Sequence, residues 1–137
     1  MKRGLLVWFT IIATIGMMAV VALAANPHFV SGPTITSGTN TVTACGKIAG
    51  LGNNKQVTIV VEATATTTCQ NRGGNTPPGL TETLVGRETI TSDKNGNVTF
   101  CVTTSKATNP CPDQMKPTTS FTNFTVKVYD AQGNQIL

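Results

Sequence analysis

Hydrophobic and polar residues alternate with a period of two along most of the chain after residue 25. The segment "TVTACGKI" places Val42, Ala44 and Ile48 on one side, and the residues between them are mostly polar. The segments "QVTIVVEATATTTC", "NVTFCVTT" and "FTVKVYD" repeat this alternation. Because successive side chains of a β-strand point to opposite faces, the pattern predicts strands with one buried and one solvated face.

Clusters of glycine, asparagine, aspartate and proline divide the alternating segments into short runs. They predict seven strands, at 33–36, 41–49, 56–68, 84–92, 97–104, 121–129 and 134–137. Short strands separated by frequent turn signals are typical of a sandwich or barrel. Two long polar connections remain, at 69–83 and 105–120.

The composition favours the same all-β class. Residues 25–137 include 23 threonines, and valine is frequent. Side chains branched at Cβ lose rotamer freedom in helices and pack well on a pleated sheet. We therefore expect an all-β, two-sheet sandwich.

The first 25 residues have a different character. Lys2 and Arg3 precede an apolar run from Leu5 to Ala25, and "ALA" at 22–24 lies just ahead of Asn26 and Pro27. This layout predicts a secretory signal helix at 1–24 and one mature domain at 25–137, secreted or at the cell surface. The alternative is an uncleaved membrane anchor, because the run approaches the roughly 20 residues that span a bilayer.

The charged residues argue against several classes of function. Loss of Lys2 and Arg3 lowers the formal charge from +4 to +2, and the remaining cations are scattered. Nucleic-acid binding requires a clustered basic surface, so we expect no nucleic-acid partner. The acidic residues form no constellation with His28, the only histidine, so we expect neither an enzyme nor a cofactor.

The mature segment contains four cysteines, an even number that favours two disulfides in an exported chain. Cys45 and Cys101 both lie in the middle of a predicted strand, on its polar side. They can bridge if those two strands are antiparallel neighbours. Cys69, at the end of a strand, and Cys111, in the connection 105–120, are left for each other. A zinc site is the alternative, but the chain has no Cys-x-x-Cys pair.

An immunoglobulin-type Greek key satisfies both bridges at once. In that topology the second strand neighbours the fifth in one sheet, and the third neighbours the sixth in the other. The first pairing places Cys45 beside Cys101, and the second brings the end of 56–68 near the start of 121–129. We therefore expect an immunoglobulin-like sandwich of about seven strands with two disulfides.

The segments "TSDKNGNVTFCVTT" and "VTIVVEATATTT" resemble strands of bacterial immunoglobulin-like extracellular domains. Those domains often carry an Asp-x-Asn-Gly turn followed by alternating valine and threonine. The resemblance covers about half of the mature chain. It implies a structural or adhesive role at the cell surface and transfers no binding residue.

Two features are candidates for recognition of a ligand. The first is the loop "CQNRGGNTPPGLTE", in particular Asn71, Arg72, Gly73 and Gly74, because sandwiches usually bind through loops held by a rigid scaffold. The second is a pair of exposed aromatic residues, Phe121 and Tyr129, on one strand. The alternatives are a solvated polar insertion for the loop and core or edge packing for the rings.

The segments "DKNGN" at 93–97 and "DAQGN" at 130–134 have two interpretations. Alternating oxygen ligands are typical of a calcium loop, but the glycine and glutamate positions of an EF-hand are not matched. We interpret both as hairpin turns in which Gly96 and Gly133 supply a positive φ.

The predicted strand 134–137 is much shorter than its neighbour 121–129, so part of that neighbour's edge is expected to be unpaired. Unpaired edges accept strands from other chains. The tail 25–35 is a candidate donor. We expect a non-enzymatic structural or adhesive module that self-associates. The alternative is a secreted domain that binds a glycan or protein through the loops 69–83 and 105–120.

Overall fold

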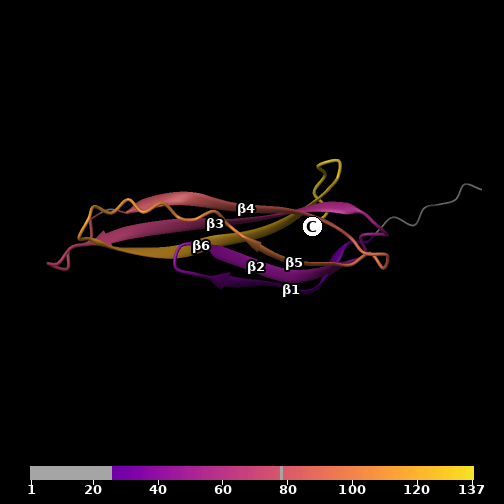
Figure 1. Cartoon of the computed structure of the whole chain (residues 1–137), viewed down its shortest axis with the longest axis horizontal. Helices are drawn as coiled ribbons and strands as arrows, with labels where there is room; N and C mark the ends of the chain where they lie inside the picture. Colours follow the sequence, from indigo (N-terminus) through magenta and orange to yellow (C-terminus); the bar gives the residue numbers. More distant parts are fainter. Residues whose placement is uncertain (1–25, 78) are drawn as a thin grey trace, which may run out of the picture.

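A computed structural model describes residues 26–77 and 79–137, and these residues form six β-strands and no helix. The strands are β1 (His28–Ser37), β2 (Val42–Ala49), β3 (Gln56–Gln70), β4 (Leu80–Thr91), β5 (Val98–Thr103) and β6 (Lys116–Asp130). They form two antiparallel sheets, with the orders β1-β2-β5 and β4-β3-β6 (Figure 1). The predicted signal peptide, 1–24, lies outside the described residues.

The all-β class and the two expected strand pairings are confirmed. Strand β2 pairs with β5, and β3 pairs with β6, both antiparallel. The expected seventh strand is not formed, because residues 134–137 contact β6 only at its end, through an isolated bridge between Gln135 and Tyr129 and hydrogen bonds to Val128 and Asp130. The first strand begins at His28 rather than at residue 33. Its alternation was hard to recognise because two register irregularities interrupt it between Phe29 and Thr34.

The hydrophobic core lies between the two sheets where both are present. Its members are the inward-facing residues of the alternating segments: Ala44, Ile48, Leu51, Val57, Ile59, Val61, Val98, Phe100, Val102 and Val128. Phe100 is the largest fully buried side chain, and its ring lies 6.3 Å from that of Phe29 on β1. The period of two therefore predicted the buried face of these strands correctly.

The sheet β4-β3-β6 is much longer than the sheet β1-β2-β5 and projects beyond it (Figure 1). We call this projecting part, residues 64–70, 80–83 and 116–122, the distal extension. Its inner face carries Ala65, Thr67 and Cys69, all buried. Since no strand of the shorter sheet reaches this face, another segment must cover it.

That segment is the coil 104–115, which connects β5 to β6. Its start is fixed to β2, because Thr104 and Val42 exchange two hydrogen bonds of 2.9 and 3.0 Å. Further along, the Glu82 carboxylate accepts the backbone N–H and the hydroxyl of Thr108. Gly86 allows the chain to cross β4, because a Cβ there would collide with the carbonyl oxygen of Thr103.

Both predicted disulfides are present. Cys45 and Cys101 lie directly opposite each other on β2 and β5, with Cα atoms 4.1 Å apart, on the outer face of the shorter sheet. Cys69 at the end of β3 is bonded to Cys111 in the coil, with Cα atoms 5.5 Å apart. The first disulfide therefore joins β2 to β5 in the part of the molecule where the two sheets face each other, which we call the core half. The second holds the coil against the distal extension.

Candidate functional site

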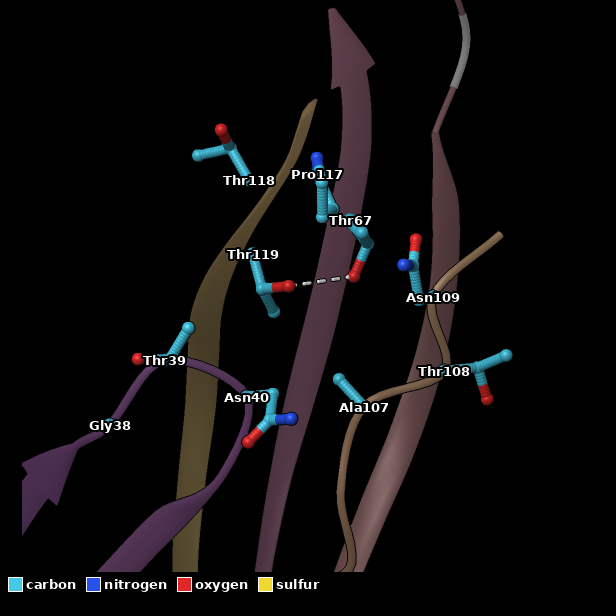
Figure 2. Close-up of a pocket in the computed structure, with 10 residues that line it drawn as sticks. All are labelled: Gly38, Thr39, Asn40, Thr67, Ala107, Thr108, Asn109, Pro117, Thr118 and Thr119. Atoms are coloured by element: carbon cyan, nitrogen blue, oxygen red, sulfur yellow. Dashed lines mark hydrogen bonds between the residues drawn. The ribbon is translucent and has the colours of Figure 1, made fainter. Parts of the chain in front are cut away.

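A polar cleft of about 360 Å³ opens on the inner face of the distal extension (Figure 2). Three segments that are far apart in the sequence line it. They are the β1–β2 turn (Gly38, Thr39, Asn40), the coil (Ala107, Thr108, Asn109) and the sheet (Thr67, Pro117, Thr118, Thr119). The cleft exists because the coil covers only part of this face and leaves the β6 side open.

A pair of threonine hydroxyls forms the floor of the cleft. Thr67 on β3 and Thr119 on β6 are register partners, and their Oγ1 atoms lie 3.0 Å apart (Figure 2). Thr67 is only 2% exposed, whereas Thr119 is half-buried. Because a hydroxyl can donate one hydrogen bond and accept two, this pair keeps capacity for a ligand after bonding to itself.

The walls of the cleft are fixed by backbone contacts. The backbone N–H of Ala107 donates to the carbonyl oxygen of Asn40 at 2.7 Å, which joins the turn to the coil. The side-chain oxygen of Asn109 accepts the N–H of Cys111 at 3.0 Å, next to the second disulfide. The turn itself is closed by a bond from Gly38 to Thr41. The geometry of the cleft is therefore set before any ligand arrives.

The lining residues define the chemistry that the cleft supports. All of them are uncharged, and five are threonines and two are asparagines. The Thr108 hydroxyl donates to Glu82 and Thr118 lies opposite Thr68 on the outer face, so the hydroxyls of Thr67 and Thr119 are the ones that face the cleft (Figure 2). The proline ring, the alanine and the threonine methyl groups add small apolar surfaces. The cleft can therefore exchange hydrogen bonds with a neutral polar molecule, and the residues that line it include no strong nucleophile or general base.

The candidate loop residues directly follow β3, at the start of the β3–β4 connection, and are Asn71, Arg72, Gly73 and Gly74. All four are exposed and lie outside the cleft. Asn71 is occupied in closing a turn. Its side-chain oxygen accepts the N–H of Asn75 at 3.0 Å, and its carbonyl oxygen accepts the N–H of Gly74. Gly74 has a φ of 80°. Of the four residues, Arg72 keeps a side chain that projects from this turn without a described hydrogen bond.

The same turn occurs three times, at 71–75, 93–97 and 130–134. In each copy the first residue is Asn or Asp, the fourth is a glycine with positive φ, and the fifth is Asn. The first side chain accepts the N–H of the fifth residue, at 3.0, 2.9 and 2.8 Å. Sequence analysis recognised two copies but missed that of Asn71, although the pattern Asn/Asp-x-x-Gly-Asn identifies all three.

The turn interpretation of 93–97 and 130–134 is confirmed by these bonds, with one correction. Residues 93–97 connect β4 in one sheet to β5 in the other, so this turn forms a corner between sheets and not a hairpin. In both copies one carboxylate oxygen accepts two backbone N–H groups. For Asp93 these are the N–H groups of Asn95 and Asn97, each at 2.9 Å.

The expected pair of outward aromatic rings is not formed. Tyr129 lies opposite Thr58 on the outer face, whereas Phe121 lies opposite the fully buried Ala65 on the inner face. The cause is a bulge at which Asn123, with a φ of 53°, and Phe124 occupy the space between the partners of Glu62 and Thr64. The extra residue reverses the alternation, so the even spacing of 121 and 129 no longer means a shared face.

The outer edge of β6 is the second candidate site. The described residues beyond Asp130 cover it only at its end, where Val128 donates to Leu137 and accepts from Ile136. Since the backbone groups of Val128 point away from β3, alternation directs those of Val126 the same way. Phe124 is 41% exposed. Within the described residues, the edge from Lys116 to Lys127 has no strand partner.

Other candidate chemistry is sparse in the part of the chain that the structure describes. His28, at the start of β1, has Nδ1 at 2.9 Å from the carbonyl oxygen of Asn26. Among residues 26–77 and 79–137, no three His, Cys, Asp or Glu side chains gather as a metal site. The same residues contain no helix long and apolar enough to cross a membrane.

No protein-family model, curated protein or solved structure gives a significant match to this chain.

Proposed function

We propose that this protein is an exported, non-enzymatic structural or adhesive module of the cell surface or extracellular matrix, which self-associates through the edge of β6. The observation that carries the proposal is the unpaired edge from Lys116 to Lys127, described above. An unpaired edge of this length presents free backbone donors and acceptors to another chain.

The strand orders support an immunoglobulin-like Greek key for this module. In such sandwiches a seventh strand pairs with the sixth, on the side away from the third strand. Here the order β1-β2-β5 and the pair β3-β6 match that topology, and Gln135 begins the seventh strand without extending it. Strand β4 differs, because it pairs with β3, whereas the fourth strand of a seven-strand sandwich lies beside the fifth. The strand supplied by a second copy would continue from the place that Leu137 reaches.

The two disulfides support export, because bonds of this kind persist in oxidising compartments. The expected donor, the tail 25–35, needs revision. Most of this tail belongs to β1 and is paired with β2 from His28 onward. It can act as a donor only if it leaves β2, so exchange between two copies replaces simple addition of a free tail.

The test is to fill the edge within one chain. We would extend the protein after Leu137 by about eight alternating valine and threonine residues, which is a typical strand length. This strand should pair with β6 and abolish concentration-dependent oligomers in analytical ultracentrifugation. An extension of equal length in glycine and serine is the control and should leave them intact. Equal assembly of the two proteins, or an unextended protein that stays monomeric at high concentration, contradicts the proposal.

A second candidate function is recognition of a glycan or protein ligand through the segment 105–120. The cleft favours it, because six of the ten lining residues come from this segment: Ala107, Thr108, Asn109, Pro117, Thr118 and Thr119. The loop 69–83 contributes no lining residue, although its Cys69 and Glu82 hold the segment 105–120 in place. Loss of ligand capture after substitution of Thr119, with normal folding, is the corresponding test.

A further inference from the structure

We infer that the polar cleft binds a neutral saccharide of one or two sugar rings. This rests on the second candidate function, ligand recognition by segment 105–120, and assigns it a chemical class of ligand. The cleft opens on the sheet face, and its β6 residues Pro117, Thr118 and Thr119 also belong to the segment proposed for self-association.

The charge of the lining residues indicates what charge the ligand carries. All ten lining residues are uncharged. The Glu82 carboxylate, which does not line the cleft, is engaged by the N–H and hydroxyl of Thr108. A charged ligand would lose hydration here without meeting an opposite charge, which is costly. The ligand is therefore neutral.

The hydrogen-bonding groups of the cleft match those of a sugar. The floor and walls present hydroxyls and amides, which both donate and accept, and the direction of the bond between Thr67 and Thr119 is free to reverse. Sugar hydroxyls have the same dual character. An extended peptide is instead recognised by the free backbone groups of a sheet edge, and this cleft lies above a sheet face.

The size and the fixed walls of the cleft suit a small ligand. A volume of about 360 Å³ is near the lower end for ligand pockets, ~300–1,000 Å³, which suits a small molecule or the end of a chain. The Cys69–Cys111 bond and the contact of Asn40 with Ala107 fix the walls, so little ordering opposes binding. Pro117 and the threonine methyl groups provide apolar surface for the C–H face of a sugar ring.

The experiment is an NMR titration of the exported, disulfide-intact protein labelled with ¹⁵N. The probes are the neutral disaccharides cellobiose, lactose and N,N′-diacetylchitobiose, with a disaccharide containing a uronic acid as the charged comparison. We expect one neutral probe to shift the amide signals of residues 38–40, 107–109 and 118–119. The dissociation constant should be on the order of 1 mM, because the contact area is small and the lining residues include no aromatic ring.

Two variants test the assignment. Thr119→Val removes a floor hydroxyl with little change in shape and should weaken binding about fivefold. Asn40→Ala removes a wall amide and keeps the backbone oxygen that holds Ala107, so it remains informative if Thr119→Val folds poorly. The matched control is Thr122→Val, which removes an exposed hydroxyl from the outer face of the same strand and should leave binding unchanged.

Three outcomes would overturn the inference. They are the absence of any response to neutral disaccharides, a response only to the charged probe, or shifts that map outside the cleft. Capture of a protein ligand that Thr119→Val abolishes, without a saccharide response, would also overturn it while leaving ligand recognition by segment 105–120 intact. The failure of the saccharide assignment and the failure of that function are thereby distinguishable.

Discussion

The distal extension continues the long sheet beyond the core half, but the two regions are stabilised in different ways. In the core half, valine, isoleucine and phenylalanine side chains of two sheets pack against each other. In the distal extension, alanine and threonine lie beneath a coil that hydrogen bonds and one disulfide hold in place. Side chains of this molecule are therefore buried in two ways, by packing between two sheets or beneath a hydrogen-bonded coil. Only the first contributes strongly through the hydrophobic effect.

The largest effect should come from emptying the core half. Phe100→Ala removes the largest fully buried side chain and should lower the free energy of unfolding by about 3–5 kcal/mol. Phe121→Ala in the distal extension removes a half-buried ring and should cost clearly less. Urea unfolding of both variants measures the difference. Equal costs would show that the distal extension is as tightly packed as the core.

Removing the second disulfide should separate the two halves. The Cys69–Cys111 bond encloses a sequence separation of 42, and the chain-entropy model gives about 4 kcal/mol for such a loop. In the double variant Cys69→Ser/Cys111→Ser we expect hydrogen exchange to accelerate in 64–70 and 116–122, with the amides of Ile59 and Val128 staying protected.

The matched comparison is the double variant Cys45→Ser/Cys101→Ser, which opens a separation of 56 in the core half. Its entropic cost is similar, but the loss should be spread over the whole domain, because these strands also pair directly and pack on the core. Accelerated exchange confined to the distal extension in both double variants would contradict the division of the molecule into two halves.

The crossing of β4 by the coil is the junction between the halves. Gly86→Ala should cost about 1–3 kcal/mol, since the added methyl group meets the backbone of Thr103 and Thr104 and forces the coil away. Gly133→Ser is a control at a glycine with open space around it, although its positive φ adds some strain. Hydrogen exchange at Ser105 and Ala107 reports displacement of the coil. A Gly86→Ala protein with unchanged exchange there would exclude this tight crossing.

The two halves also differ in how far the sequence predicted them. In the core half the alternation gave the buried face, and the polar phase of Cys45 and Cys101 gave their bond, because both depend on the local period of two. In the distal extension the predicted strands 56–68 and 121–129 were too short, because β3 continues to Gln70 and β6 begins at Lys116. Thr67 looks solvated in the sequence, but in the structure it is only 2% exposed, beneath segments that are distant in the chain.

The failures at the candidate sites have a related physical cause. The bulge at Asn123 changes which face Phe121 occupies, and a single residue in the left-handed region has no strong sequence signature. The cleft joins residues near 39, 108 and 118, and only the three-dimensional path of the coil brings them together. The predicted disulfide between Cys69 and Cys111 implies that the coil lies against β3. It does not predict the route that the coil takes over β4.

The smallest effects should come from the three related turns, which allow the halves to be compared with the same chemistry. Asp93→Ala removes an oxygen that accepts two backbone N–H groups at the corner of the core half, and should cost about 1 kcal/mol. Asn71→Ala removes an acceptor with one such bond at the exposed tip of the distal extension, and should cost less. Asp93→Asn keeps the acceptor and serves as the control in urea unfolding. If Asn71→Ala were the more damaging of the two, the distal tip would carry more of the domain's stability than its packing indicates.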